Sequence, residues 1–101
     1  MAKWADYGIS EVRYDLAENH IVAVMCHEDT GDSIAAGVEI TRATVVTRIE
    51  SGKTFVTIRK NSEGKYVRGE DVRVVEIDGA KYIRTDANKT KADNLGTLPR
   101  F

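Results

Sequence analysis

The stretch VRVVEIDGAKYIRT, residues 72–85, decides the fold of this chain. It contains two runs rich in β-branched and aromatic residues, separated by the dipeptide Asp78-Gly79. Such a dipeptide between two apolar runs is typical of a two-residue hairpin turn, because aspartate and glycine tolerate the positive φ angles that this turn needs. The short turn also sets the register, so we expect residues on the two strands to face each other pairwise, beginning with Ile77 opposite Ala80.

The same register brings two arginines together. It places Glu76 opposite Lys81, which is a favourable pair, and Arg73 opposite Arg84, which is not. The repulsion between the two arginines could be offset in two ways. A neighbouring carboxylate could neutralise the arginines, or an external anion such as phosphate could be held by both guanidinium groups. The carboxylates within reach along the chain are Glu70, Asp71 and Asp86.

Hydrophobic patterns before this hairpin predict further strands. Alternation of polar and apolar residues, or a short apolar run, marks each of them. The predicted strands are Ile9–Tyr14, His20–His27, Thr54–Lys60, one strand in two parts over Lys65–Arg68 and Val72–Ile77, and Ala80–Thr85. Residues 69–71 predict a bulge or an interruption in the strand that leads to the hairpin. Residues 28–37 are polar and then small, which indicates a loop.

One helix is expected in the middle of the chain. Thr41 has the residue type of a helix N-cap, and Ile40 and Val45 could form a hydrophobic staple around it. Val45 and Ile49 share one helical face, and Gly52 is well placed to end the helix. With the strands this predicts an α+β domain in the order ββαβββ. We expect an antiparallel sheet of four to five strands with the helix on one face, or alternatively a sheet curled toward a barrel.

Length and composition predict one domain over residues 1–101. The chain is 42% hydrophobic and 31% charged, as expected of a folded protein with a small core. It contains no apolar run of the ~20 residues that a membrane helix needs, and it does not open on a secretory signal. Its one cysteine, Cys26, excludes an internal disulfide, so we expect a cytoplasmic protein without membrane contact.

Charge is distributed unevenly although the net charge is only −1. Residues 1–52 carry four basic and nine acidic side chains, whereas residues 53–101 carry eleven basic and seven acidic ones. The basic half with its interleaved aromatic residues would suit an anionic partner. A solvated surface with a modest dipole would give the same counts, and the pI of about 6.1 is low for a dedicated nucleic-acid binder.

Motifs for catalysis or metal binding are absent from the sequence pattern. Cys26 and His27 are neighbours on a predicted strand, so their side chains point to opposite faces and cannot easily hold one ion. No serine lies in a nucleophile-elbow motif, and no glycine pattern suits a phosphate loop. We therefore expect no catalytic residue, no metal and no cofactor, and an enzyme is less expected than a binding protein.

The end of the chain has a different character. Residues 86–101 are polar with few apolar anchors, and we expect them to form a tail that wraps the domain and covers a sheet edge. The run YIRTDANKTKADNLGTLP, residues 82–99, resembles the closing signature of an uncharacterised family of short prokaryotic proteins, known only as a domain of unknown function. The resemblance spans about residues 8–99. It implies a single prokaryotic domain and supplies no reaction, ligand or catalytic residue.

Three functions remain open at this point. The leading hypothesis is a non-enzymatic binding or adaptor module for an unknown protein or nucleic acid, which would use the basic C-terminal half. The second is a small-ligand binder or enzyme with an anion site, and the third is a structural homodimer. The candidate binding residues are Arg73, Arg84, Lys89, Lys91 and Asn94.

Overall fold

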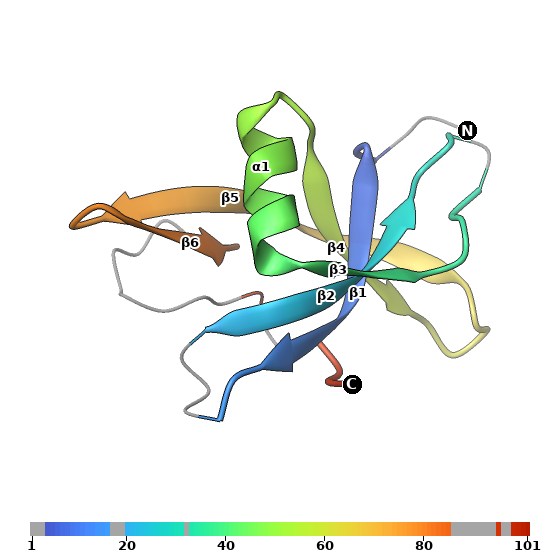
Figure 1. The fold of residues 1–101 in the computed structure, drawn as a ribbon. Coiled ribbons are helices and arrows are strands. Elements are labelled where there is room, and N and C mark those ends of the chain that lie inside the picture. Colours follow the sequence, from blue (N-terminus) through green and yellow to red (C-terminus); the bar gives the residue numbers. More distant parts are fainter. Residues whose placement is uncertain (1–3, 17–19, 32, 86–94, 96–97) are drawn as a thin grey trace.

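In the computed structural model, the described residues form six strands and one helix (Figure 1). The structure describes residues 4–16, 20–31, 33–85, 95 and 98–101. Its elements are β1 (Tyr7–Tyr14), β2 (Ile21–Glu28), β3 (Val38–Thr41), α1 (Arg42–Glu50), β4 (Phe55–Lys60), β5 (Tyr66–Ile77) and β6 (Ala80–Arg84). The strand order in the sheet is β3-β2-β1-β4-β5-β6.

The expected α+β class is confirmed, but the expected strand count and order are wrong. Instead of ββαβββ, a third strand, β3, precedes the helix, so six strands are present and not four to five. The sheet is mixed and not purely antiparallel, because β1 runs parallel to β4. It is also not closed into the alternative barrel, since β3 and β6 form its two ends. The hydrophobic pattern did not predict the short β3, because its four residues are mostly exposed and have no buried alternating face.

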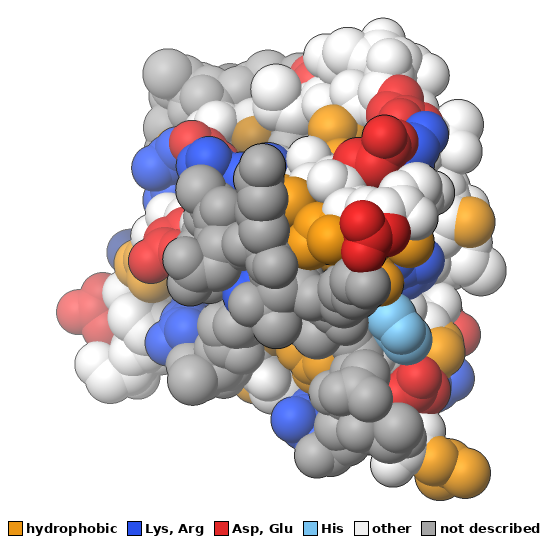
Figure 2. All heavy atoms as spheres, turned by 90° about the vertical axis from the view of Figure 1, so that its left-hand side faces the viewer, with side chains coloured by type: hydrophobic (Ala, Val, Ile, Leu, Met, Phe, Trp, Pro, Cys, Tyr) orange, Lys and Arg blue, Asp and Glu red, His pale blue; other side chains and the backbone are white. Residues whose placement is uncertain are grey.

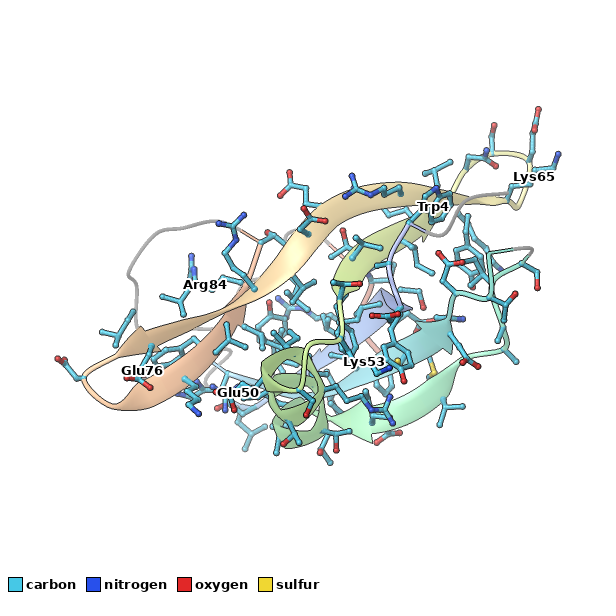
Figure 3. All side chains as sticks on the ribbon, turned by 90° about the horizontal axis from the view of Figure 1, so that it is seen from above. Trp4, Glu50, Lys53, Lys65, Glu76 and Arg84 are labelled. Atoms are coloured by element: carbon cyan, nitrogen blue, oxygen red, sulfur yellow. The ribbon has the colours of Figure 1, made fainter. Side chains whose placement is uncertain are left out.

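The hairpin at residues 78–79 has the predicted register. Asp78 and Gly79 have φ angles of 51° and 81°, as a type I′ turn requires. Ile77 faces Ala80, and Arg73 faces Arg84. Long β5 carries this hairpin, and Figure 3 shows Lys65 and Glu76, which lie near its two ends, far apart along the molecule.

The helix begins as predicted. Thr41 is its N-cap, with the Thr41 hydroxyl accepting a hydrogen bond from the Thr44 N–H at 3.2 Å. Val45 is completely buried against the sheet, and Ile49 packs on the same cluster. The helix ends at Glu50, and Gly52 follows with a φ of 98°, which suits the predicted stop. None of the described helical segments is long and apolar enough to cross a bilayer.

The sheet carries a separate apolar cluster on each face. The larger cluster lies under α1 and includes Val45, Cys26 and Phe55. The smaller cluster is built around Val56 and Ile58, with Tyr66 packed against it. Since side chains alternate along a strand, Phe55 and Val56 reach opposite faces of β4. The helix covers only one of these faces, which leaves the other face more open.

Register shifts interrupt the strand pairing at three points: one falls between Arg13 and Tyr14 near the end of the β1–β2 pair, and the other two bear on the site. In β1 the pairs Ile9–Cys26 and Glu11–Met25 leave Ser10 as an extra residue. In β5 residues 69–70 stand opposite Thr57 alone, so the bulge predicted at residues 69–71 is confirmed. A bulge turns the following side chains and increases the local twist. The one in β1 decides where Ser10 points.

The last residues of the chain pair with the second half of β1. The Val12 N–H donates to the Pro99 carbonyl oxygen at 2.9 Å, and the Phe101 N–H donates to the Val12 carbonyl oxygen at 3.1 Å. The Arg13 guanidinium lies 4.5 Å from the centre of the Phe101 ring. The pairing of β4 with β1 ends at Ile9, and beyond that point residues 98–101 lie along the same edge of β1. The expected wrap over residues 86–94 lies outside the described residues.

Candidate functional site

The two predicted arginines are register partners in very different surroundings. Arg84 is only 4% exposed, whereas Arg73 is exposed at the surface of β5. The three other residues of the predicted site, Lys89, Lys91 and Asn94, lie outside the described residues. An anion site around this group stays a prediction.

Charges on the hairpin side of the molecule are mixed. The Arg68 guanidinium donates to the Asp71 carboxylate at 2.7 Å, and the Lys81 ammonium donates to the Glu50 carboxylate at 2.5 Å. The hydrogen bond to Glu50 at the end of α1 raises the pKa of Lys81, and the charge of Glu76, its neighbour across the hairpin, acts in the same direction. On the visible described part of this face, Figure 2 shows Lys and Arg side chains mixed with Asp and Glu. Those described residues form no uninterrupted basic patch.

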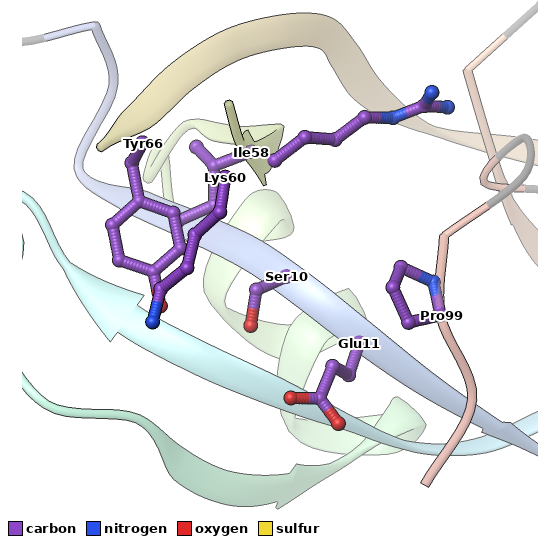
Figure 4. Close-up of a pocket in the computed structure, with 7 residues that line it drawn as sticks. Ser10, Glu11, Ile58, Lys60, Tyr66 and Pro99 are labelled. Carbon is purple, nitrogen blue, oxygen red and sulfur yellow. The ribbon is translucent and has the colours of Figure 1, made fainter. Parts of the chain in front are cut away.

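A more promising site lies on the opposite side of the sheet from α1, where β1 and β4 separate. Their parallel pairing ends at Ile9 and Thr57. Beyond this point a pocket of about 400 Å³ opens between the two strands and the C-terminal segment. The residues that line it are Ser10, Glu11, Ile58, Arg59, Lys60, Tyr66 and Pro99. Figure 4 shows Lys60 and Tyr66 on one side of Ser10, with Pro99 on the other.

Ser10, which lines this pocket, forms a hydrogen bond with the buried His27. The Ser10 hydroxyl and the His27 Nε2 are 2.7 Å apart, and the His27 Nδ1 is 2.8 Å from the Ala35 carbonyl oxygen. A carbonyl oxygen can only accept, so Nδ1 carries a proton and donates it. In the neutral imidazole Nε2 is then the acceptor, and the Ser10 hydroxyl donates to it. The proton of Ser10 therefore points at a base.

The imidazole ring is held firmly in this orientation. His27 is 5% exposed, and its ring lies 5.2 Å from the Tyr66 ring in a tilted arrangement. On another side Gly37 comes so close that a Cβ there would lie 2.9 Å from the His27 Cε1 atom. The backbone of residues 35–37 thus both accepts a hydrogen bond from Nδ1–H and packs against the ring.

Charged groups stand around the mouth of the pocket. The Lys60 ammonium lies 5.3 Å from the centre of the Tyr66 ring, a distance at which a cation is attracted to the aromatic face. Glu11 supplies a carboxylate to the same pocket. The lining therefore combines apolar surface with two cations, Arg59 and Lys60, one anion and the hydroxyl of Ser10.

Sequence reasoning missed the pairing of Ser10 with His27. The two residues are 17 positions apart and sit on neighbouring strands, so no local motif joins them. One signal was available. Ser10 and Glu11 are two consecutive polar residues in an otherwise alternating strand, which is the pattern that a bulge produces. A bulge at this point lets both side chains line the same pocket.

The argument that separated Cys26 from His27 agrees with the structure. Cys26 belongs to the core cluster under α1, while His27 contacts Tyr66 and Ser10 on the other face. In the parts of the chain that the structure describes, no three His, Cys, Asp or Glu side chains gather as a metal site would need.

Comparison with known proteins identifies the family and no activity. Neither a curated protein nor a solved structure gives a significant match to this chain. One family model, described as "Protein of unknown function (DUF3892)", matches residues 8–99, which is most of the chain. Because this family model covers most of the chain, the protein belongs to the DUF3892 family.

Proposed function

We propose that this protein is a small-ligand binding module whose site is the pocket between β1, β4 and the C-terminal segment. The observation that carries this proposal is the pocket itself, with about 400 Å³ of space and a mixed lining. Ligand pockets commonly have volumes of 300–1,000 Å³ and combine apolar walls with a few polar groups. The face of the sheet opposite α1 provides such a lining here.

The lining selects a planar ligand with an anionic end. Tyr66, Ile58 and Pro99 offer apolar surface against which a ring can lie. The Lys60 ammonium next to the Tyr66 ring attracts a carboxylate. Glu11 accepts a hydrogen bond from a hydroxyl group elsewhere on the ligand. These features together suit a small aromatic hydroxy acid.

Titration with 4-hydroxybenzoate tests this proposal. We expect amide signals of Ser10, Glu11 and Tyr66 to shift in two-dimensional NMR spectra of the ¹⁵N-labelled protein. At about 0.3 kcal/mol for each of roughly ten non-hydrogen atoms, the binding free energy is about 3 kcal/mol, so the Kd should be about 6 mM. The uncharged 4-hydroxybenzamide should bind several-fold more weakly, because it lacks the charge that Lys60 attracts.

A pair of lysine variants supplies the control. Lys60→Met should weaken binding of 4-hydroxybenzoate several-fold, while Lys65→Met should leave it unchanged, because Lys65 is exposed and does not line the pocket. Shifts spread over the whole surface would contradict the proposal. So would equal binding of the acid and the amide, or equal binding by the two variants.

The wider partner hypotheses stay predictions beside this one. If the basic C-terminal half binds nucleic acid, oligonucleotide affinity should fall steeply as salt increases. If Arg73 and Arg84 hold an external anion, phosphate should stabilise the wild-type protein and not Arg84→Ala. A structural homodimer would show twice the chain mass in solution.

A further inference from the structure

We propose that Ser10 is a nucleophile activated by His27, and that the pocket accepts small carboxylic esters whose acyl group is transferred to Ser10. This inference rests on the ligand-binding role proposed for the same pocket. It adds a reaction at the same pocket, in which a carboxylic acid of the kind that the pocket binds is the product released from an ester.

The hydrogen bonds around His27 arrange a nucleophile, a base and an orienting group in one line. His27 Nδ1–H donates a hydrogen bond to the Ala35 carbonyl oxygen, with 2.8 Å between the nitrogen and the oxygen, which leaves Nε2 without a proton in the neutral ring. Nε2 lies 2.7 Å from the Ser10 oxygen, within the range for direct proton transfer. A serine becomes a useful nucleophile when a base oriented in this way removes its proton.

Access and rigidity support the same role. Ser10 lines the pocket although its side chain is mostly buried, and His27 lies behind it, away from solvent. Tyr66 and Gly37 pack against the imidazole and limit its rotation. The β1 bulge presents Ser10 to this space, and bulges of this kind occur next to active sites because they re-aim a side chain.

The other described serines are in different surroundings. The Ser51 hydroxyl donates to the Thr47 carbonyl oxygen at 2.8 Å, so it is bonded to a helix end and not to a base. Ser33 lies in an exposed turn with Thr30. Ser62 is exposed in the loop between β4 and β5. These three serines therefore serve as controls for the reactivity of Ser10 within the same molecule.

The reaction follows from this geometry. The Ser10 oxygen attacks the ester carbonyl carbon while its proton moves to His27 Nε2, and a bond between the Ser10 oxygen and the acyl carbon forms. The bond from that carbon to the alcohol oxygen then breaks, and the leaving alcohol takes the proton from His27. Water, activated by the same nitrogen, releases the acid and restores Ser10. The Lys60 ammonium in the pocket supplies positive charge for the transient oxyanion.

We expect this chemistry to be slow. A carbonyl oxygen keeps His27 in the correct tautomer, but it stabilises the imidazolium less than the carboxylate of a catalytic triad does. Covalent labelling of Ser10 is therefore a more sensitive measurement than turnover.

Diisopropyl fluorophosphate is the probe that tests the proposal. The Ser10 oxygen would attack phosphorus, fluoride would leave, and the proton would pass to His27. We expect one adduct in the intact mass of the wild-type protein, mapped to Ser10 by peptide sequencing. Ser10→Ala should give no adduct, Ser62→Ala should behave as wild type, and His27→Gln should react on the order of 100-fold more slowly. With 4-nitrophenyl acetate, acetylation of Ser10 should appear as a burst of nitrophenolate.

The outcomes test separately the nucleophile Ser10, the role of His27 and the pocket as a ligand site. No adduct in the wild type, or equal labelling of Ser10, Ser51 and Ser62, overturns the proposal even if His27→Gln proves unfolded by circular dichroism. Equal rates in wild type and folded His27→Gln overturn the role of His27. Binding of 4-hydroxybenzoate without labelling removes the nucleophile and keeps the binding function, whereas loss of both removes the pocket as a ligand site.

Discussion

Replacing Gly69 with alanine tests the bulge that joins β5 to β4. Gly69 lies on Thr57 so closely that a Cβ would stand 2.2 Å from the Thr57 Oγ1 atom and 2.9 Å from the Thr57 carbonyl oxygen. Thr57 cannot move aside freely, because it is 4% exposed and its Oγ1 accepts a hydrogen bond from the Glu70 N–H at 3.0 Å. Gly69→Ala must therefore either break this bond or separate the strands.

The expected loss follows from these two effects. Overpacking a tight site costs about 1–3 kcal/mol, and a lost hydrogen bond costs about 1 kcal/mol more. We therefore expect Gly69→Ala to lower the free energy of unfolding by about 2–4 kcal/mol. Because a small domain has about 5–15 kcal/mol in all, the variant should still fold in water.

Urea unfolding followed by far-UV circular dichroism measures this loss, and a second variant identifies its cause. Thr57→Ala removes the Oγ1 atom that the new methyl group meets first. In that background Gly69→Ala should cost about 1–2 kcal/mol less than in the wild type, with the Thr57 carbonyl oxygen accounting for the remainder. The predicted clash with Thr57 Oγ1 would be refuted if Gly69→Ala lowered the free energy of unfolding by less than about 0.5 kcal/mol in the wild type, or by the same amount in both backgrounds.

Three further predictions concern a helix cap, the hairpin turn and the buried thiol. Thr41→Ala should lower the free energy of unfolding by about 1 kcal/mol, because the helix loses its N-cap acceptor; no loss relative to the exposed Thr47→Ala would contradict this role. Gly79→Ala should cost about 1–2 kcal/mol through its φ of 81° alone, since nothing lies near its Cβ position; an unchanged urea midpoint would rule out this strain. Burial raises the pKa of Cys26 from 9.0 to about 11 despite the nearby Arg48, so the native thiol should not react with Ellman's reagent at pH 8 and should react once unfolded; rapid native reaction would count against burial. Because the folded pKa is the higher one, the stability difference between wild type and Cys26→Ala should be complete below pH 9 and should decline as the pH rises toward 11.

The features that follow from neighbouring residues were visible in the sequence. The turn at Asp78-Gly79 needs two positive φ angles, and the residues themselves allow them, so the register down to Arg73 and Arg84 followed at once. Thr41 caps its helix through an atom three residues away. In both cases the interacting groups lie within a few positions of each other, and the local pattern carries the information.

Only the tertiary structure decided the features that join distant parts of the chain. The parallel contact of β1 with β4, the short edge strand β3 and the gap that forms the pocket depend on how the sheet is assembled. The pair of Ser10 and His27 depends in addition on one extra residue in β1, which turns a serine toward a histidine on the next strand. Side-chain chemistry was present in the sequence from the start, but its proximity is a property of strand order and register, which long-range packing selects.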